Sequence, residues 1–176
     1  RAKSIKPSAT LAVSAHAAQL RAQGKNIISL SAGEPDFDTP AHIKSAAIEA
    51  INKGQTKYTA VDGTLELKQA IINKFKRENS LTYEANQILV SCGAKHSLYN
   101  IFQATLNPDD EIIIPAPFWA SYPDMAKLSG AVPIIIKTTI DNNFKIDAYS
   151  LEKAISEKTR MFLLNSPSNP SGSNYT

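Results

Sequence analysis

The sequence predicts an α/β fold built around a largely parallel sheet. In its later part, short runs rich in β-branched residues alternate with segments of helical periodicity. This alternation is typical of strands that are joined by crossover helices. Strands are expected at residues 87–91, 111–115, 132–137 and 161–165. A crossover helix is expected at 121–128, ending at Gly130, and two others around the apolar faces near Phe102 and Leu151.

The first third of the chain predicts helices separated by loops. Thr39 followed by Pro40 is typical of a helix start, and Gly54 of the end of the same helix. A second helix is expected from about Thr64. An earlier amphipathic helix is indicated by apolar residues at helical spacing before Gly24, namely Leu11, Ala15, Ala18 and Ala22.

The composition is that of a globular protein. The 176 residues are 43% hydrophobic and 20% charged, and no run approaches the roughly 18 apolar residues of a membrane helix. The single cysteine, Cys92, excludes an internal disulfide and fits a reducing compartment. His16, His42 and His96 have no metal-ligand spacing with one another or with Cys92, so we expect no structural zinc.

Basic residues predominate before the first acidic residue, Glu34. Such an arm is also found in nucleic-acid-binding proteins and in targeting peptides. The amphipathic spacing of the same segment favours a helix packed on the protein body over both of these alternatives.

Three turns that follow predicted strands carry candidate ligand-binding residues. Gly93 and Ala94 lie where a strand ends and a helix begins, the place where free N–H groups bind phosphate. Trp119 follows the next strand, and Asn169 lies in the run N-S-P-S-N-P-S-G after the last one, where two X-Pro bonds favour a cis peptide. In open α/β sheets, ligands bind outside the carboxyl ends of the strands. Taken singly, each residue is more typical of an ordinary turn or of a core aromatic than of a ligand-binding site.

Five motifs together resemble the bacterial aspartate aminotransferases, class-I members of the fold-type-I enzymes that depend on pyridoxal 5'-phosphate. The resemblance covers nearly the whole chain but only the N-terminal part of that family. The motifs are Gly33 in S-A-G-E-P-D-F-D-T-P, Tyr58 in T-K-Y-T-A-V-D-G, Gly93-Ala94-Lys95, Trp119 in P-A-P-F-W-A-S-Y-P, and Asn169 in N-S-P-S-N-P-S-G.

The resemblance implies a fold and a domain arrangement. Residues 39–176 would be the N-terminal part of the large cofactor-binding domain, a three-layer α/β sandwich of which the chain supplies a partial sheet. Residues 1–38 would form an N-terminal helical arm of the small domain together with the substrate loop.

The resemblance also assigns a role to each motif. The cofactor phosphate would lie at Gly93, Ala94 and Lys95, and Trp119 would stack on the pyridine ring. Asn169 would bind the ring oxygen and the substrate carboxylate, and the backbone at Gly33 would help to hold that carboxylate. Trp119 thus borders both cofactor and substrate.

Four further implications concern the partner subunit, the substrate and the compartment. Tyr58 would reach the phosphate of the other subunit of a homodimer. Lys95 and Thr10 match positions that receive the distal carboxylate of a dicarboxylic substrate, and Lys6 matches one linked to prephenate. The partners would be amino acids and keto acids, and neither nucleic acid nor a membrane would be bound. The protein would lie in the cytoplasm.

The chain departs from the family pattern at two positions within the motifs. Ala94 and Ser171 stand where many members have glycine and threonine, and both differences are conservative.

The implied reaction is transamination between L-aspartate and 2-oxoglutarate. No catalytic residue is expected within the chain, because the family's Schiff-base lysine corresponds to a position beyond Thr176. We therefore expect the functional protein to be longer and the chain alone to be inactive. In the family sheet, strand 87–91 does not neighbour the other three strands.

Three alternatives remain open at this point. One is an aromatic or prephenate aminotransferase of the same family, and another is a non-catalytic module that binds pyridoxal phosphate. The third is a doubly wound nucleotide-binding domain, which is disfavoured because the chain has neither G-x-G-x-x-G nor a P-loop motif.

Overall fold

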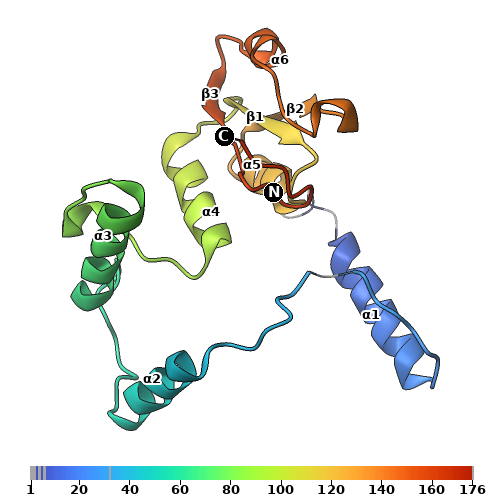
Figure 1. Cartoon of the computed structure of the whole chain (residues 1–176). Coiled ribbons are helices and arrows are strands. Elements are labelled where there is room, and N and C mark those ends of the chain that lie inside the picture. The colour runs from blue at the N-terminus through green and yellow to red at the C-terminus, as the bar shows by residue number, and fades with distance from the viewer. Residues whose placement is uncertain (1–2, 4, 6, 32, 176) are drawn as a thin grey trace. The chain divides into compact units, whose positions relative to one another are not determined.

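The computed structural model describes residues 3, 5, 7–31 and 33–175. The chain divides into two units, one of Lys6–Leu67 and one of Arg1–Ile5 with Lys68–Thr176, and Figure 1 labels their helices and strands. The predicted boundary between residues 38 and 39 stays a prediction, since it concerns the domains of a longer protein.

The unit of Lys6–Leu67 contains two complete helices, α1 (Ala9–Ala22) and α2 (Ala41–Asn52). The side chain of Ser8 caps α1 by accepting the N–H of Leu11 at 3.3 Å. Helix α2 begins one residue later than predicted. Pro40 is its N-cap, and the preceding N–H of Thr39 is taken up by the Asp38 carboxylate at 2.8 Å. Thr39 therefore does not cap α2.

The other unit contains the sheet. Helix α3 (Leu65–Asn79) leads into it from the first unit, and its start confirms the prediction, because Thr64 Oγ1 accepts the N–H of Leu67. The remaining helices and strands are α4 (Ala94–Thr105), β1 (Glu111–Ala116), α5 (Ser121–Leu128), β2 (Val132–Lys137), α6 (Ala148–Ala154) and β3 (Thr159–Phe162). Short 3₁₀ turns lie at Ala85–Gln87 and Ile140–Asn142.

The sheet is parallel, with the strand order β2-β1-β3. Central strand β1 pairs Ile113 with Ile134 of β2 and with Phe162 of β3. The predicted α/β class is confirmed, and the bounds of β2 and α5 are those predicted. Strand β3 starts and ends earlier than predicted, because its pairing with β1 begins at Thr159 and ends at Phe162.

The strand predicted at residues 87–91 is wrong. Ile88 has an extended backbone (φ −111°, ψ 124°), but no described segment pairs with it, and an extended segment forms a strand only by hydrogen bonding to a neighbour. The preceding residues form a 3₁₀ turn that is closed by a capping box between Glu84 and Gln87. Within the described residues, the sheet does not include this segment.

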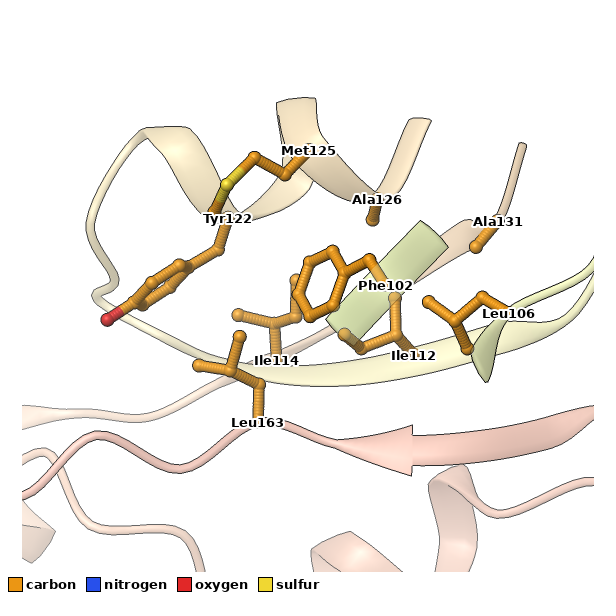
Figure 2. Packing of buried hydrophobic residues seen from close by; sticks show 9 residues of the cluster. All are labelled: Phe102, Leu106, Ile112, Ile114, Tyr122, Met125, Ala126, Ala131 and Leu163. Carbon is orange, nitrogen blue, oxygen red and sulfur yellow. The ribbon is translucent and has the colours of Figure 1, made fainter. Parts of the chain in front are cut away.

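The hydrophobic core lies between β1 and the helices α4 and α5. Figure 2 shows Phe102 of α4 and Met125 and Ala126 of α5 facing Ile112 and Ile114 of β1. Ile113 points to the other face of the sheet, because successive strand residues alternate, and it is also completely buried. Both faces of β1 are therefore covered, as its continuous apolar run predicts.

The end of α5 is closed by a Schellman motif. The N–H of Ala131 donates to the carbonyl of Ala126, and that of Gly130 to Lys127, both at 3.0 Å. Gly130 has a φ of +90°, and a Cβ there would contact Pro108 Cα at 3.4 Å. Glycine is thus favoured by the left-handed backbone conformation, while the Cβ of another residue would lie in van der Waals contact with Pro108.

Truncation of the completely buried Phe102 is predicted to destabilise the sheet-bearing unit. Phe102→Ala removes the ring between α4 and β1, and the expected loss is about 3–5 kcal/mol of unfolding free energy. Urea unfolding monitored by circular dichroism would measure it. The exposed Lys127→Ala on α5 is the control and should change stability by less than about 0.5 kcal/mol. Similar losses for both variants would contradict the assigned core.

Candidate functional site

In the turn before α4, several backbone N–H groups donate to acceptors within the turn itself. The N–H of Gly93 donates to the carbonyl of Ser91 at 2.8 Å, and the N–H of Cys92 donates to Nδ1 of His96 at 3.1 Å. The N–H groups of His96 and Ser97 both turn back to the carbonyl of Gly93, at 3.1 and 3.3 Å. The donors on either side of residues 94 and 95 are thus satisfied within the turn.

Two neighbouring donors, the N–H groups of Ala94 and Lys95, have no hydrogen-bond partner in the described part of the chain. They occupy the first two positions of α4, where the helix dipole adds partial positive charge. Gly93, the N-cap, has φ +83° and ψ 166°, and an added Cβ would meet nothing within 4 Å. Glycine is required here by backbone conformation, and the space above the turn is open to an anion.

Trp119 lies next to this turn. It follows β1, packs against the core and forms a T-shaped pair with Tyr122, whose ring centroid is 5.5 Å away at an interplanar angle of 87°. The ammonium of Lys95 lies over the Trp119 ring, 4.7 Å from its centroid. This cation–π contact places Lys95 and Trp119 together, as two candidate ligand-binding residues should be. Burial raises the pKa of the Tyr122 hydroxyl, so Tyr122 stays neutral over the physiological range.

Asn169 lies in a turn with a dense local network of hydrogen bonds. Its N–H donates to Asn165 Oδ1 at 2.8 Å, while Ser168 exchanges backbone bonds with Gly172 and Ser173. The Ser166–Pro167 and Asn169–Pro170 bonds are both cis, which confirms the prediction for this run. The Ala116–Pro117 bond, before Trp119, is cis as well.

The same turn is fastened to the segment before α6. Ser173 Oγ donates to the carbonyl of Asn143 at 2.6 Å, and the hydroxyl of Tyr175 accepts the N–H of Ile146 at 2.7 Å. The exposed Asn169 borders a small hollow that Tyr122 and Phe118 also line. Through Tyr122, the hollow at Asn169 adjoins the Trp119–Lys95 pair.

The remaining predicted site residues belong to the unit of Lys6–Leu67. Thr10 is exposed on α1, Gly33 lies in an exposed irregular segment, and the Tyr58 ring is fully exposed in the loop after α2. Lys6 lies outside the described residues. The roles implied for these four residues stay predictions.

His96 and Asn165 take part in the site although neither was singled out as a site residue. His96 supplies the acceptor for the turn before α4, and Asn165 holds the backbone at Asn169. A signal for His96 existed in the sequence, because it is the third residue after the N-cap glycine, the position whose side chain folds back in a capping box. The role of Asn165 depends on a turn geometry that the sequence does not reveal.

Within the described residues, no three His, Cys, Asp or Glu side chains gather as a metal site would require. Across the same residues, none of the helices has the length and apolar character to span a membrane.

Comparison with known proteins identifies the class. Residues 25–176 match the family of class I and II aminotransferases, and the chain belongs to that family. It is 62% identical over its whole length to an aspartate/prephenate aminotransferase of Nitrosomonas europaea and 53% identical to an aspartate aminotransferase of Bacillus sp. strain YM-2. It covers 44% and 45% of these two proteins, so it spans less than half of their length.

Solved structures show the same relationship. The aspartate aminotransferase of Rhizobium meliloti superimposes with a TM-score of 0.93 at 51% identity. That of Thermus thermophilus with maleate superimposes with a TM-score of 0.96 at 43% identity. The chain is covered to 99% in both cases, against 44% and 46% of those proteins. The predicted fold type is thereby confirmed, as the N-terminal part of such a protein.

The contact between Lys95 and Trp119 predicts a spectroscopic change on mutation. Lys95→Met removes the cation that holds the indole face, so the near-UV circular dichroism of the ring should weaken. Trp119 is the only tryptophan of the 176-residue chain, so its bands are directly assignable. Lys95→Arg keeps a cation over the ring and should preserve the signal. Equal spectra for the methionine and arginine variants would show that the contact does not orient the ring.

Proposed function

We propose that this chain is the N-terminal part of an aminotransferase that depends on pyridoxal 5'-phosphate and transfers an amino group between L-aspartate and 2-oxoglutarate. The observation that carries the proposal is the pair of free N–H groups at Ala94 and Lys95 beside the Trp119 ring. A phosphate acceptor next to an aromatic face suits a ligand that carries both a phosphate and a flat heteroaromatic ring.

Three parts of the chain would hold the cofactor. The N–H groups of Ala94 and Lys95 would take the phosphate, since Gly93 leaves the approach free of side chains. Trp119 would stack on the pyridine ring, and the amide of Asn169 would bind the ring oxygen. When bound, pyridoxal phosphate supplies the electron sink that lets an amino acid lose its α-proton. The described residues orient that ring and bind anions.

Substrate recognition is proposed for both units of the chain. Lys95 offers a cation for the distal carboxylate of aspartate, and Gly33 and Asn169 would hold the α-carboxylate. Thr10 and Lys6 would assist at the distal carboxylate and in the use of prephenate.

A homodimer with shared sites is part of the proposal. Tyr58 is fully exposed and lies in a polar loop, as suits a side chain that reaches toward another subunit. We also propose a cytoplasmic enzyme, to which the single, unpaired cysteine is suited.

A prephenate-using aminotransferase is the second candidate. The names of several relatives support it, including that of Nitrosomonas europaea and a probable aspartate/prephenate aminotransferase of Rhizobium leguminosarum at 56% identity. Comparing turnover of aspartate, prephenate and phenylalanine by the protein that carries this chain separates the candidates.

The proposed cofactor contact predicts the effect of Asn169→Ala. In the protein that carries this chain, loss of the amide should lower kcat/KM for aspartate with 2-oxoglutarate by tenfold or more, about 1.4 kcal/mol. The exposed Asn174→Ala, in the same segment, is the matched control and should leave kcat/KM within about twofold. If the unsubstituted protein produced no glutamate with the cofactor present, the proposed reaction would be wrong.

Lys95→Ala distinguishes two roles for its ammonium. If Lys95 receives the distal carboxylate, kcat/KM should fall by tenfold or more for aspartate and little for phenylalanine. An equal loss for both substrates would assign the charge to the cofactor phosphate instead.

A further inference from the structure

We propose that His96 is a positioning residue for the phosphate turn, acting through its imidazole Nδ1 on the N–H of Cys92. The inference rests on the proposed function, in which Ala94 and Lys95 bind the phosphate. It concerns a residue that contacts neither cofactor nor substrate in that proposal.

His96 holds the turn at two points. Its side chain accepts the N–H of Cys92 at 3.1 Å, and its own N–H donates to the carbonyl of Gly93 at 3.1 Å. The residues before and at the N-cap are therefore both bound to one residue in the first turn of α4. This arrangement keeps the Cys92 donor occupied and leaves the next free donors at Ala94 and Lys95.

The contact also defines the tautomer of the imidazole. A ring nitrogen that accepts a hydrogen bond carries no proton, so the contact corresponds to the tautomer with its proton on Nε2. Cys92, Lys95 and Tyr99 line the same hollow as His96, and Lys95 is the charged group among them. The cation at this end of the site is therefore Lys95.

A neutral acceptor at this position has a physical reason. In an ordinary capping box the third helical residue is glutamate or glutamine, and a carboxylate there is favoured by the helix dipole. Beside a bound phosphate, however, a carboxylate would add like-charge repulsion. Histidine provides the acceptor without the negative charge. At residue 96, helix stability is therefore favoured by a negative side chain, whereas phosphate binding is favoured by a neutral one.

Three substitutions of similar shape separate the effect of the acceptor at residue 96 from the effect of its charge. His96→Asn places Oδ1 at the same branch position as Nδ1 and keeps a neutral acceptor. His96→Leu keeps the branch without an acceptor, and His96→Asp keeps the acceptor but adds a charge. The measured quantity is the ratio of the affinities of pyridoxamine 5'-phosphate and pyridoxamine, which isolates the phosphate, in the protein that carries this chain.

The expected pattern distinguishes positioning from a purely structural role. His96→Asn should keep the affinity ratio within about threefold of the unsubstituted protein, and His96→Leu should lower it by roughly tenfold. His96→Asp should lower it by tenfold or more while leaving the melting temperature unchanged or raised. An unchanged ratio in the leucine and aspartate variants would overturn the proposal, as would losses that only follow the melting temperature.

A second measurement addresses the contact without any ligand. Proton–nitrogen correlation spectra of His96 should show the proton on Nε2, and amide exchange at Cys92 should accelerate in His96→Leu but not in His96→Asn. A proton on Nδ1 would overturn the inference whatever the cofactor affinity. If the tautomer and exchange are as expected but the unsubstituted protein prefers pyridoxamine phosphate no more than pyridoxamine, the proposed cofactor is wrong, and so is the role of His96 toward a phosphate.

Discussion

The burial of β1 on both faces is the constraint on which the candidate site depends. Ile112, Ile113 and Ile114 are completely buried, so β1 is held in the interior, in parallel register with β2 and β3. Its carboxyl end then delivers Trp119 to the edge of the sheet. Strand β3 runs parallel to β1, so the turn that contains Asn169 emerges at the same edge. Two residues 50 positions apart in sequence thus reach one region through two paired parallel strands.

Helix α4 contributes through its packing and its start. Phe102 and Leu106 join the core beneath β1 and α5, which fixes the direction of the helix. The N-terminus of α4 consequently lies beside Trp119, close enough for the Lys95 ammonium to lie over the indole ring. Anion binding and aromatic stacking are therefore adjacent because one core orients both elements.

Features set by local chemistry were predictable from the sequence. The bounds of β2 and α5, the helix stop at Gly130 and the cis peptides around Asn169 depend on residues that are close in sequence. The strand expected at 87–91 failed because an extended segment becomes a strand only when a partner is present. Side-chain contacts such as that of Cys92 with His96 depend on the orientation of a ring, which apolar periodicity does not report. The placement of Lys95 and Trp119 after two predicted strands suggested one ligand-binding region, but the contact between the two side chains was not predictable from the sequence.

The two site turns differ from the sheet in what stabilises them. The bonds of Asn169 to Asn165 and of Cys92 to His96 span four residues each, whereas β1 and β3 pair across more than forty. Closing a short loop costs little conformational entropy, so these local bonds support the turns at low cost, and the turn of Asn169 is held in addition by the longer-range bonds of Ser173 and Tyr175. Helix α2 shows the opposite situation, because none of its residues is buried and its apolar side chains therefore stabilise it little. Local hydrogen bonds thus preorganise the two turns that face the proposed ligand. Because the backbone donors are already held in place, binding an anion costs little additional conformational entropy of the chain.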